Sequence, residues 1–196
     1  MKELIKDIIL AIVAMLIIGY GYTAFASSGD IDENTYANER IHLGFELPEG
    51  YSFVSKEELK KMYSVSSVGM LPVRIKNDMA VKLPGKDDKY AVHVITADSI
   101  FTEPLSPTEA IESCKELFID YCEGLNATNI ATEVETVSFC GINTSVCSIS
   151  YIVEDATNYI LCHVYNIEHG FVAVATYGHT KEEAIKLMEA FYYIED

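Results

Sequence analysis

The strongest strand signal in the chain is the run Tyr159-Ile160-Leu161-Cys162-His163-Val164-Tyr165-Asn166-Ile167. β-branched and aromatic residues dominate it, and such residues favour strands. Comparable runs lie at 133–139, 142–153 and 171–177, and the segments between them hold Gly, Asp or Asn, which favour turns. The sequence therefore predicts four consecutive antiparallel strands. The predicted turns are 140–141, 154–158 and 168–170.

Both faces of this predicted sheet are apolar. Successive side chains of a strand point to opposite faces, so alternate residues share a face. One face is expected to collect large side chains: Ile149, Tyr151, Tyr159, Leu161, Tyr165, Ile167, Phe171 and Tyr177. The other is also apolar, with Val146, Ile160 and Val174 among its members. A face in water would carry polar residues, so we expect both faces to be covered.

Three helix starts supply candidate covers. Each is a capping box, in which a Ser or Thr is followed three residues later by Glu. They are Ser55 to Glu58, Ser106 to Glu109 and Thr180 to Glu183. With further strands expected at 41–47, 79–83 and 90–97, the predicted fold class is α+β. It is an α/β/α sandwich, an antiparallel sheet covered by helices on both faces, over residues 41–196. The alternative is a face sealed by another subunit.

The chain begins with a targeting pattern. Residues 8–18 carry no polar side chain, and Ala24-Phe25-Ala26 resembles a signal-peptidase site. Residues 1–26 are therefore expected to be a signal peptide or, if uncleaved, a signal anchor that holds the protein in a membrane through residues 8–26. Either reading predicts a secreted or extracytoplasmic protein. Residues 27–40 are expected to form a flexible acidic spacer before the folded domain.

The chain is globular in composition and strongly acidic. Hydrophobic residues make up 49%, and 30 Asp and Glu face 14 Lys and Arg, for a formal net charge of −16. Binding to phosphate backbones needs clustered basic residues, so this balance argues against a nucleic-acid partner. It also argues against a polybasic module that binds a membrane surface.

The segment Leu43-Gly44-Phe45-Glu46-Leu47-Pro48-Glu49-Gly50-Tyr51 resembles the opening of PsbP-like domains, which reads Phe-x-Leu-Pro-x-Gly-aromatic. The expected order of elements over residues 41–195 is similar too. The resemblance implies an α/β/α sandwich of the kind found in binding subunits, assembly factors and secreted bacterial proteins. It carries no catalytic signature, so it implies no catalytic residue, and fold alone does not give function.

Cysteine is the first candidate for chemistry, and the count of five is odd. Cys114 and Cys122 share a predicted helix, where about 12 Å of rise separates them, too far for a disulfide. A pairing between this helix and Cys162 is open. The alternative is that these cysteines are small buried hydrophobes. Without a Cys-x-x-Cys or a paired-histidine motif, the sequence predicts neither a metal site nor a cofactor.

The candidate ligand-binding residues surround one histidine. His163 is expected to lie among Tyr151, Tyr159, Tyr165 and Tyr177 on one face, as a titratable group in a tyrosine-rich pocket. The alternative is a hydrogen-bonded core histidine. We therefore expect an exported, non-catalytic binding module with an unknown protein or cell-envelope partner. The alternative function is a small-ligand-binding protein or an enzyme with its site around His163.

Overall fold

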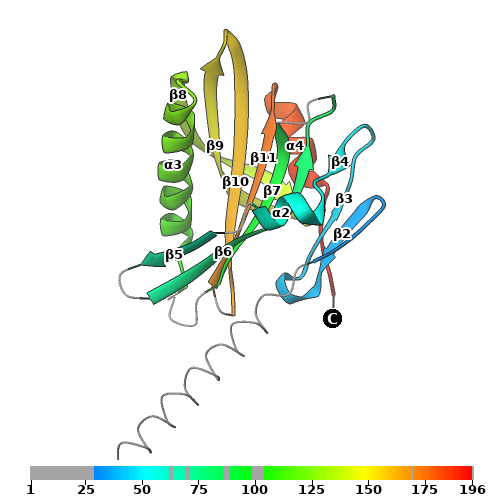
Figure 1. Ribbon diagram of the computed structural model, residues 1–196. Helices are drawn as coiled ribbons and strands as arrows, with labels where there is room; N and C mark the ends of the chain where they lie inside the picture. The colour runs from blue at the N-terminus through cyan, green and yellow to red at the C-terminus, as the bar shows by residue number, and fades with distance from the viewer. Residues whose placement is uncertain are drawn as a thin grey trace, which may run out of the picture.

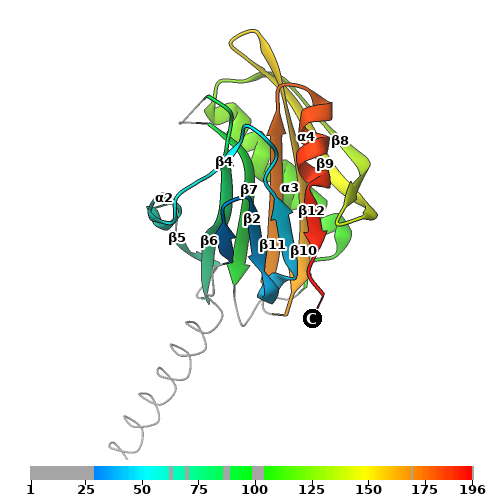
Figure 2. The same cartoon turned by 90° about the vertical axis from the view of Figure 1, so that its right-hand side faces the viewer.

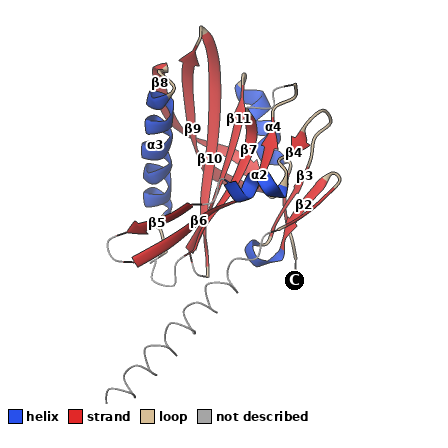
Figure 3. Cartoon of the chain, viewed as in Figure 1, coloured by secondary structure: helices blue, strands red, loops and turns tan. Residues whose placement is uncertain are grey.

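A computed structural model describes residues 29–61, 64–68, 71–85, 89–98, 104–168 and 170–195. Strands dominate this part of the chain (Figure 3). Its helical elements are η1 (Glu39–Ile41), α2 (Lys56–Lys61), α3 (Pro107–Gly124) and α4 (Lys181–Glu189). Its strands are β1 (Asp30–Asp32), β2 (Thr35–Asn38), β3 (Leu43–Glu46), β4 (Ser52–Phe53), β5 (Ser64–Val68), β6 (Leu71–Lys82), β7 (Tyr90–Asp98), β8 (Thr128–Phe139), β9 (Ile142–Val153), β10 (Ala156–Ile167), β11 (Gly170–Gly178) and β12 (Phe191–Tyr193).

The strands form two antiparallel sheets. The large sheet has the order β4-β6-β7-β11-β10-β9-β8, with β5 also paired to β6. The small sheet has the order β1-β2-β3-β12, so it joins the start of the described chain to its end. Figure 1 shows the small sheet and α4 on one side of the large sheet, and α3 on the other. The molecule therefore has three layers.

The predicted fold class is wrong in what covers the sheet. Of the described helices, only α3 lies over the face of β8, β9 and β10 that is turned away from the small sheet. The opposite face packs against both the small sheet and α4, so a second sheet provides part of the cover that was expected from helices alone (Figure 2). The third predicted cover, α2, lies at the edge of the large sheet, where Leu59 contacts Val54 and Ala80. The finding of two packed sheets replaces the helix-covered single sheet.

Residues 30–38, expected to belong to a flexible spacer, form β1 and β2 instead. Tyr36 is fully buried in the main core, and Asn38 is 4% exposed. The acids lie in β1 and the turn after it, where Asp30 and Asp32 are exposed on either side of Ile31, whereas the inward residues belong to β2. The predicted segment 1–26 lies outside the described residues. Within them, no helix is both long enough and apolar enough to cross a membrane.

Two capping boxes are formed in full, and they fix where α3 and α4 begin. Ser106 Oγ accepts from the backbone N–H of Glu109, and Thr180 Oγ1 accepts from that of Glu183. The acidic side chains bond back to the capping residues, which satisfies amides that a helix start leaves open. In the third predicted box, Ser55 Oγ accepts from the Glu58 N–H at 3.2 Å, at the start of α2. These predicted starts are confirmed.

The turns between the late strands are tighter than the sequence indicated. Glu154 and Asp155 both have positive φ, 52° and 62°, as in a two-residue type I′ hairpin, so Val153 pairs directly with Ala156. The next hairpin pairs Ile167 with Gly170. The predicted turns were longer in both places. Each shortening by an odd number of residues reverses which side chains of neighbouring strands share a face.

Candidate functional site

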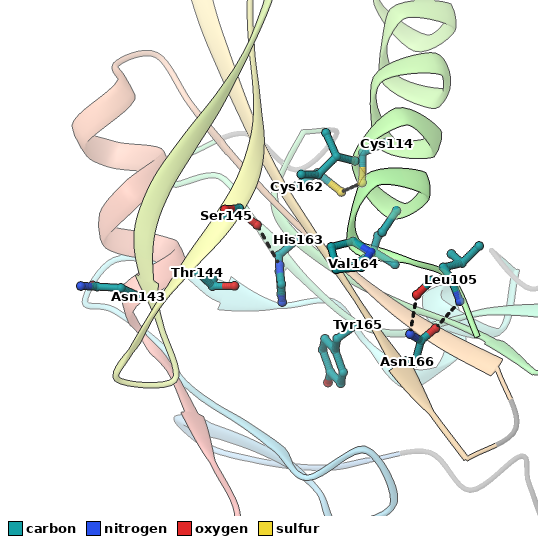
Figure 4. Close-up of a pocket in the computed structure, with 13 residues that line it drawn as sticks. Leu105, Cys114, Asn143, Thr144, Ser145, Cys162, His163, Val164, Tyr165 and Asn166 are labelled. Carbon is teal, nitrogen blue, oxygen red and sulfur yellow. Dashed lines mark hydrogen bonds between the residues drawn. The ribbon is translucent and has the colours of Figure 1, made fainter.

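The large sheet divides between β9 and β10, and the division creates a cleft. The two strands pair from Val153 and Ala156 as far as Cys147 and Cys162, and no further. Residues 142–146 of β9 stay paired with β8, while residues 163–167 of β10 stay paired with β11. Two strand edges therefore face each other without a ladder between them. Figure 4 shows the side chains that fill and border this space.

We call this space the β9–β10 cleft. Its volume is about 400 Å³, within the range of small-molecule sites in proteins. The first turns of α3 close one side of it. Its lining residues are Leu105, Pro107, Ala110, Ile111, Cys114, Asn143, Thr144, Ser145, Cys162, His163, Val164, Tyr165 and Asn166.

The lining is uncharged in a protein with a large net charge. None of the described residues around the cleft is Asp, Glu, Lys or Arg. His163 is the one member of the lining whose charge could change near neutral pH. Burial lowers its pKa, against a weaker opposing effect of the hydrogen bond to Ser145, so the ring is neutral at pH 7. The cleft therefore favours neutral groups over ions.

His163 bridges the two separated strands. Its Nδ1 donates to the backbone oxygen of Ser145 at 3.4 Å, because a carbonyl can only accept. This leaves Nε2 of the neutral ring as an acceptor. The ring packs against Phe139 at 4.9 Å and stacks with Tyr165 at 5.9 Å between centroids. The imidazole is thus held in one orientation at the edge of the cleft.

Asn166 fixes the entry to α3. Its Nδ2 donates to the backbone oxygen of Leu105 at 2.8 Å, and its Oδ1 accepts from the backbone N–H of Leu105 at 2.9 Å. The side-chain amide thereby satisfies both backbone groups of Leu105, as the backbone of a neighbouring strand would. These two hydrogen bonds connect the segment before α3, on one side of the cleft, to β10 on the other side.

The predicted pocket residues separate into two groups. Tyr159, His163 and Tyr165 lie on the face of the small sheet, where the Tyr165 hydroxyl donates to the backbone oxygen of Ile41 at 3.2 Å. Tyr151 and Tyr177 lie on the opposite face, under α3. Only His163 and Tyr165 of the five line the cleft. The single tyrosine-rich face was an error of register, caused by the two short turns.

The aromatic residues under α3 form a cluster of their own. Tyr177 contacts His93 at 5.8 Å, Phe118 at 6.3 Å and Tyr121 at 6.4 Å between centroids. Burial raises the pKa of Tyr177 well above its usual range. Burial also raises the pKa of Tyr151. These tyrosines are core residues that stay protonated.

The cleft includes polar residues that were not predicted to belong to a ligand site: Asn143, Thr144, Ser145 and Asn166. A signal for them exists. Three consecutive polar residues, 143–145, follow Ile142 at the start of a strand whose middle, residues 146–149, is wholly buried. A strand paired on both sides and covered on both faces rarely carries such a run.

Among the described residues, no group of three or more His, Cys, Asp or Glu is arranged to hold a metal ion. No protein-family model matches the chain, and no curated protein matches its sequence. The resemblance to PsbP-like domains therefore stays a prediction.

Proposed function

We propose that this chain is a non-catalytic binding protein that holds a small neutral ligand in the β9–β10 cleft. The observation that carries the proposal is the separation of two adjacent strands into an uncharged space of about 400 Å³. A continuous ladder would satisfy more backbone groups, so its interruption beside the half-buried His163 calls for a functional reason.

The lining indicates the chemistry of the ligand. Leu105, Ile111 and Val164 provide apolar surface, while Thr144 and Asn143 provide hydroxyl and amide groups. His163 offers an acceptor at Nε2. A ligand with a flat apolar body and at least one hydrogen-bond donor matches this set. Anions are disfavoured because the protein as a whole carries a formal charge of −16.

The proposal also locates the protein outside the cytoplasm. Support comes from the sequence of residues 1–26, with its apolar run and Ala24-Phe25-Ala26. A ligand-binding domain of a secreted or membrane-anchored protein would meet ligands of the cell exterior or envelope. The resemblance to PsbP-like domains supports a binding role over a catalytic one.

Filling the cleft should abolish ligand binding. Thr144 is half-buried and lines the cleft, so Thr144→Trp places an indole in the space. We expect the affinity for a neutral naphthalene dye, 6-propionyl-2-(dimethylamino)naphthalene, to fall at least about tenfold, since displacement of most contacts costs more than 1.4 kcal/mol. Fluorescence titration of the full chain measures this affinity. Competition against the dye then ranks neutral candidate ligands.

The matched control is Thr157→Trp, an exposed position of the same strand pair at the far end of β10. It should bind the dye as the unsubstituted protein does. Lowering the pH through the His163 transition should weaken binding, because protonation removes the Nε2 acceptor and brings a charge into the cleft. Equal dye affinity in both tryptophan variants would show that the cleft is not the site.

A second candidate function, recognition of a protein partner, is favoured by one surface. Leu117 and Tyr121 of α3 and Leu125, which directly follows it, are 56%, 45% and 41% exposed and recur every four residues. Such spacing places them along one side of a helix. If Leu117→Ser removed a partner found by proximity labelling while dye binding by the cleft stayed unchanged, the α3 surface would be the binding site instead.

A further inference from the structure

Two buried cysteines face each other between α3 and β10. The Sγ atoms of Cys114 and Cys162 lie 2.9 Å apart, as the close-up shows (Figure 4). Both residues are buried, with exposed fractions of 3% and 2%. A movement of about 1 Å would bring the sulfur atoms to bonding distance. Both thiols are free as the structure stands.

We propose that Cys114 and Cys162 form a disulfide that fastens α3 to the large sheet. The two positions are 48 residues apart in the chain, so the bond would close a long loop. Long closed loops constrain the unfolded chain most, which is one source of disulfide stabilisation. The bond would also lie in the wall of the β9–β10 cleft, although the pairing itself does not rest on the proposed ligand.

The other cysteines fit this pairing less well. Cys122 follows Cys114 by two helical turns, and Cys140 lies at the β8–β9 turn, far along the sheet from Cys162. Cys147 is the one competitor, because it is the direct partner of Cys162 across the β9–β10 ladder. Its thiol would remain free beside the proposed bond.

The reaction is thiol–disulfide exchange with an external disulfide, either a small-molecule disulfide or an oxidised thiol oxidoreductase. One cysteine thiolate attacks the external S–S bond, forms a mixed disulfide and releases the first thiolate. The second cysteine thiolate then attacks the mixed disulfide, forms the Cys114–Cys162 bond and releases the second. The external disulfide is reduced to two thiols, which take up the two protons that the cysteines lose.

Burial determines when the exchange can occur. Contact with the Cys114 thiol and burial raise the pKa of Cys162 well above its usual range, and burial raises that of Cys147 to about 12. The docked Cys162 thiol therefore reacts slowly, because the thiolate is the nucleophile. The bond forms while α3 is not yet packed on the sheet. Afterwards the same burial protects it from reductants.

The test is to refold the reduced, denatured full chain in oxidised and reduced glutathione, block remaining thiols and digest after glutamate. Cleavage separates Cys114 in peptide 113–116 from Cys122 in 117–123, from Cys140 and Cys147 in 136–154, and from Cys162 in 155–168. We expect peptides 113–116 and 155–168 to be joined, with the loss of two hydrogens. Joined 136–154 and 155–168, or five blocked thiols, would overturn the proposal.

Melting temperatures provide the second readout. The oxidised protein should melt about 10 °C above the same protein in reductant. Cys114→Ser and Cys162→Ser should each abolish this difference. Cys122→Ser, which changes another buried cysteine of α3, should retain it. Equal melting temperatures with and without reductant in the unsubstituted protein would contradict the stabilising bond.

Discussion

Replacing Asp78 with alanine should lower the free energy of unfolding by about 3–5 kcal/mol. Asp78 is 2% exposed, and its carboxylate holds the two sheets together. Asn38 Nδ2 from β2 donates to Oδ2 at 2.7 Å, and Lys76 Nζ from β6 lies 2.7 Å from Oδ1. Tyr36 donates its hydroxyl at 3.5 Å. Alanine would leave these donors buried without their acceptor.

The loss of stability comes from leaving several hydrogen-bond donors without their acceptor. The energy of the single ion pair with Lys76 is the smaller part. Burial raises the pKa of Asp78, and Lys76 opposes that rise. The carboxylate is therefore tolerated because its donors surround it. Removing both charges with Asp78→Leu and Lys76→Met should cost less than Asp78→Ala alone, since no unpaired ion remains.

Urea unfolding at neutral pH measures these differences. Glu46→Ala is the matched control, because it removes an exposed acid from the same small sheet and should change the free energy of unfolding by less than about 0.5 kcal/mol. A loss below about 1 kcal/mol for Asp78→Ala would mean that the two sheets do not depend on this carboxylate.

Acid should destabilise the protein through His93. Burial lowers the pKa of His93 to about 4, against about 6.5 in an unfolded chain. Between these values the unfolded state binds a proton that the folded state does not, so the free energy of unfolding falls as the pH falls. The contribution of the neutral His93 to the free energy of unfolding is fully present above pH 6.5. About 3 kcal/mol of it is lost once the pH reaches 4.

The substitution that isolates this effect is His93→Asn. Nδ1 of His93 lies 3.0 Å from Oδ1 of Asn77 and donates to it, and the asparagine amide can donate from a similar position. The difference in unfolding free energy between pH 7 and pH 4 should shrink by about 3 kcal/mol in this variant. His179→Asn, at an exposed ring that also contacts an asparagine, should keep the full difference. The same acid sensitivity in both variants would assign the loss to other groups.

The late strands and the starts of the helices could be predicted because local chemistry determines them. The bounds of β9 match the predicted 142–153, and α3 and α4 begin one residue after Ser106 and Thr180. The small sheet could not be predicted, because β3 is completed by β12 from the other end of the chain. Phe191 begins that strand two residues after the end of α4.

The site was predicted only in part. His163 and Tyr165 do line the cleft, but Tyr151 and Tyr177 lie on the other face of the sheet. Turn length decides that assignment, and Asp155 gave too weak a signal for a two-residue hairpin. Phe139, beside the β8–β9 turn, packs against Phe191 at 5.5 Å between centroids, and no local pattern of the sequence encodes such a contact between distant residues.

The pairing of Phe45 with Phe191 sets an order of events for the nascent chain. β3 (Leu43–Glu46) cannot pair with β12 until residues 191–193 have been synthesised, well over a hundred residues later. Pairing between strands so far apart in sequence slows folding, because the conformational entropy of the long loop is lost before the favourable contacts form. The small sheet is thus completed last, and a product truncated before Phe191 would leave β3 open along one side, as a template for aggregation.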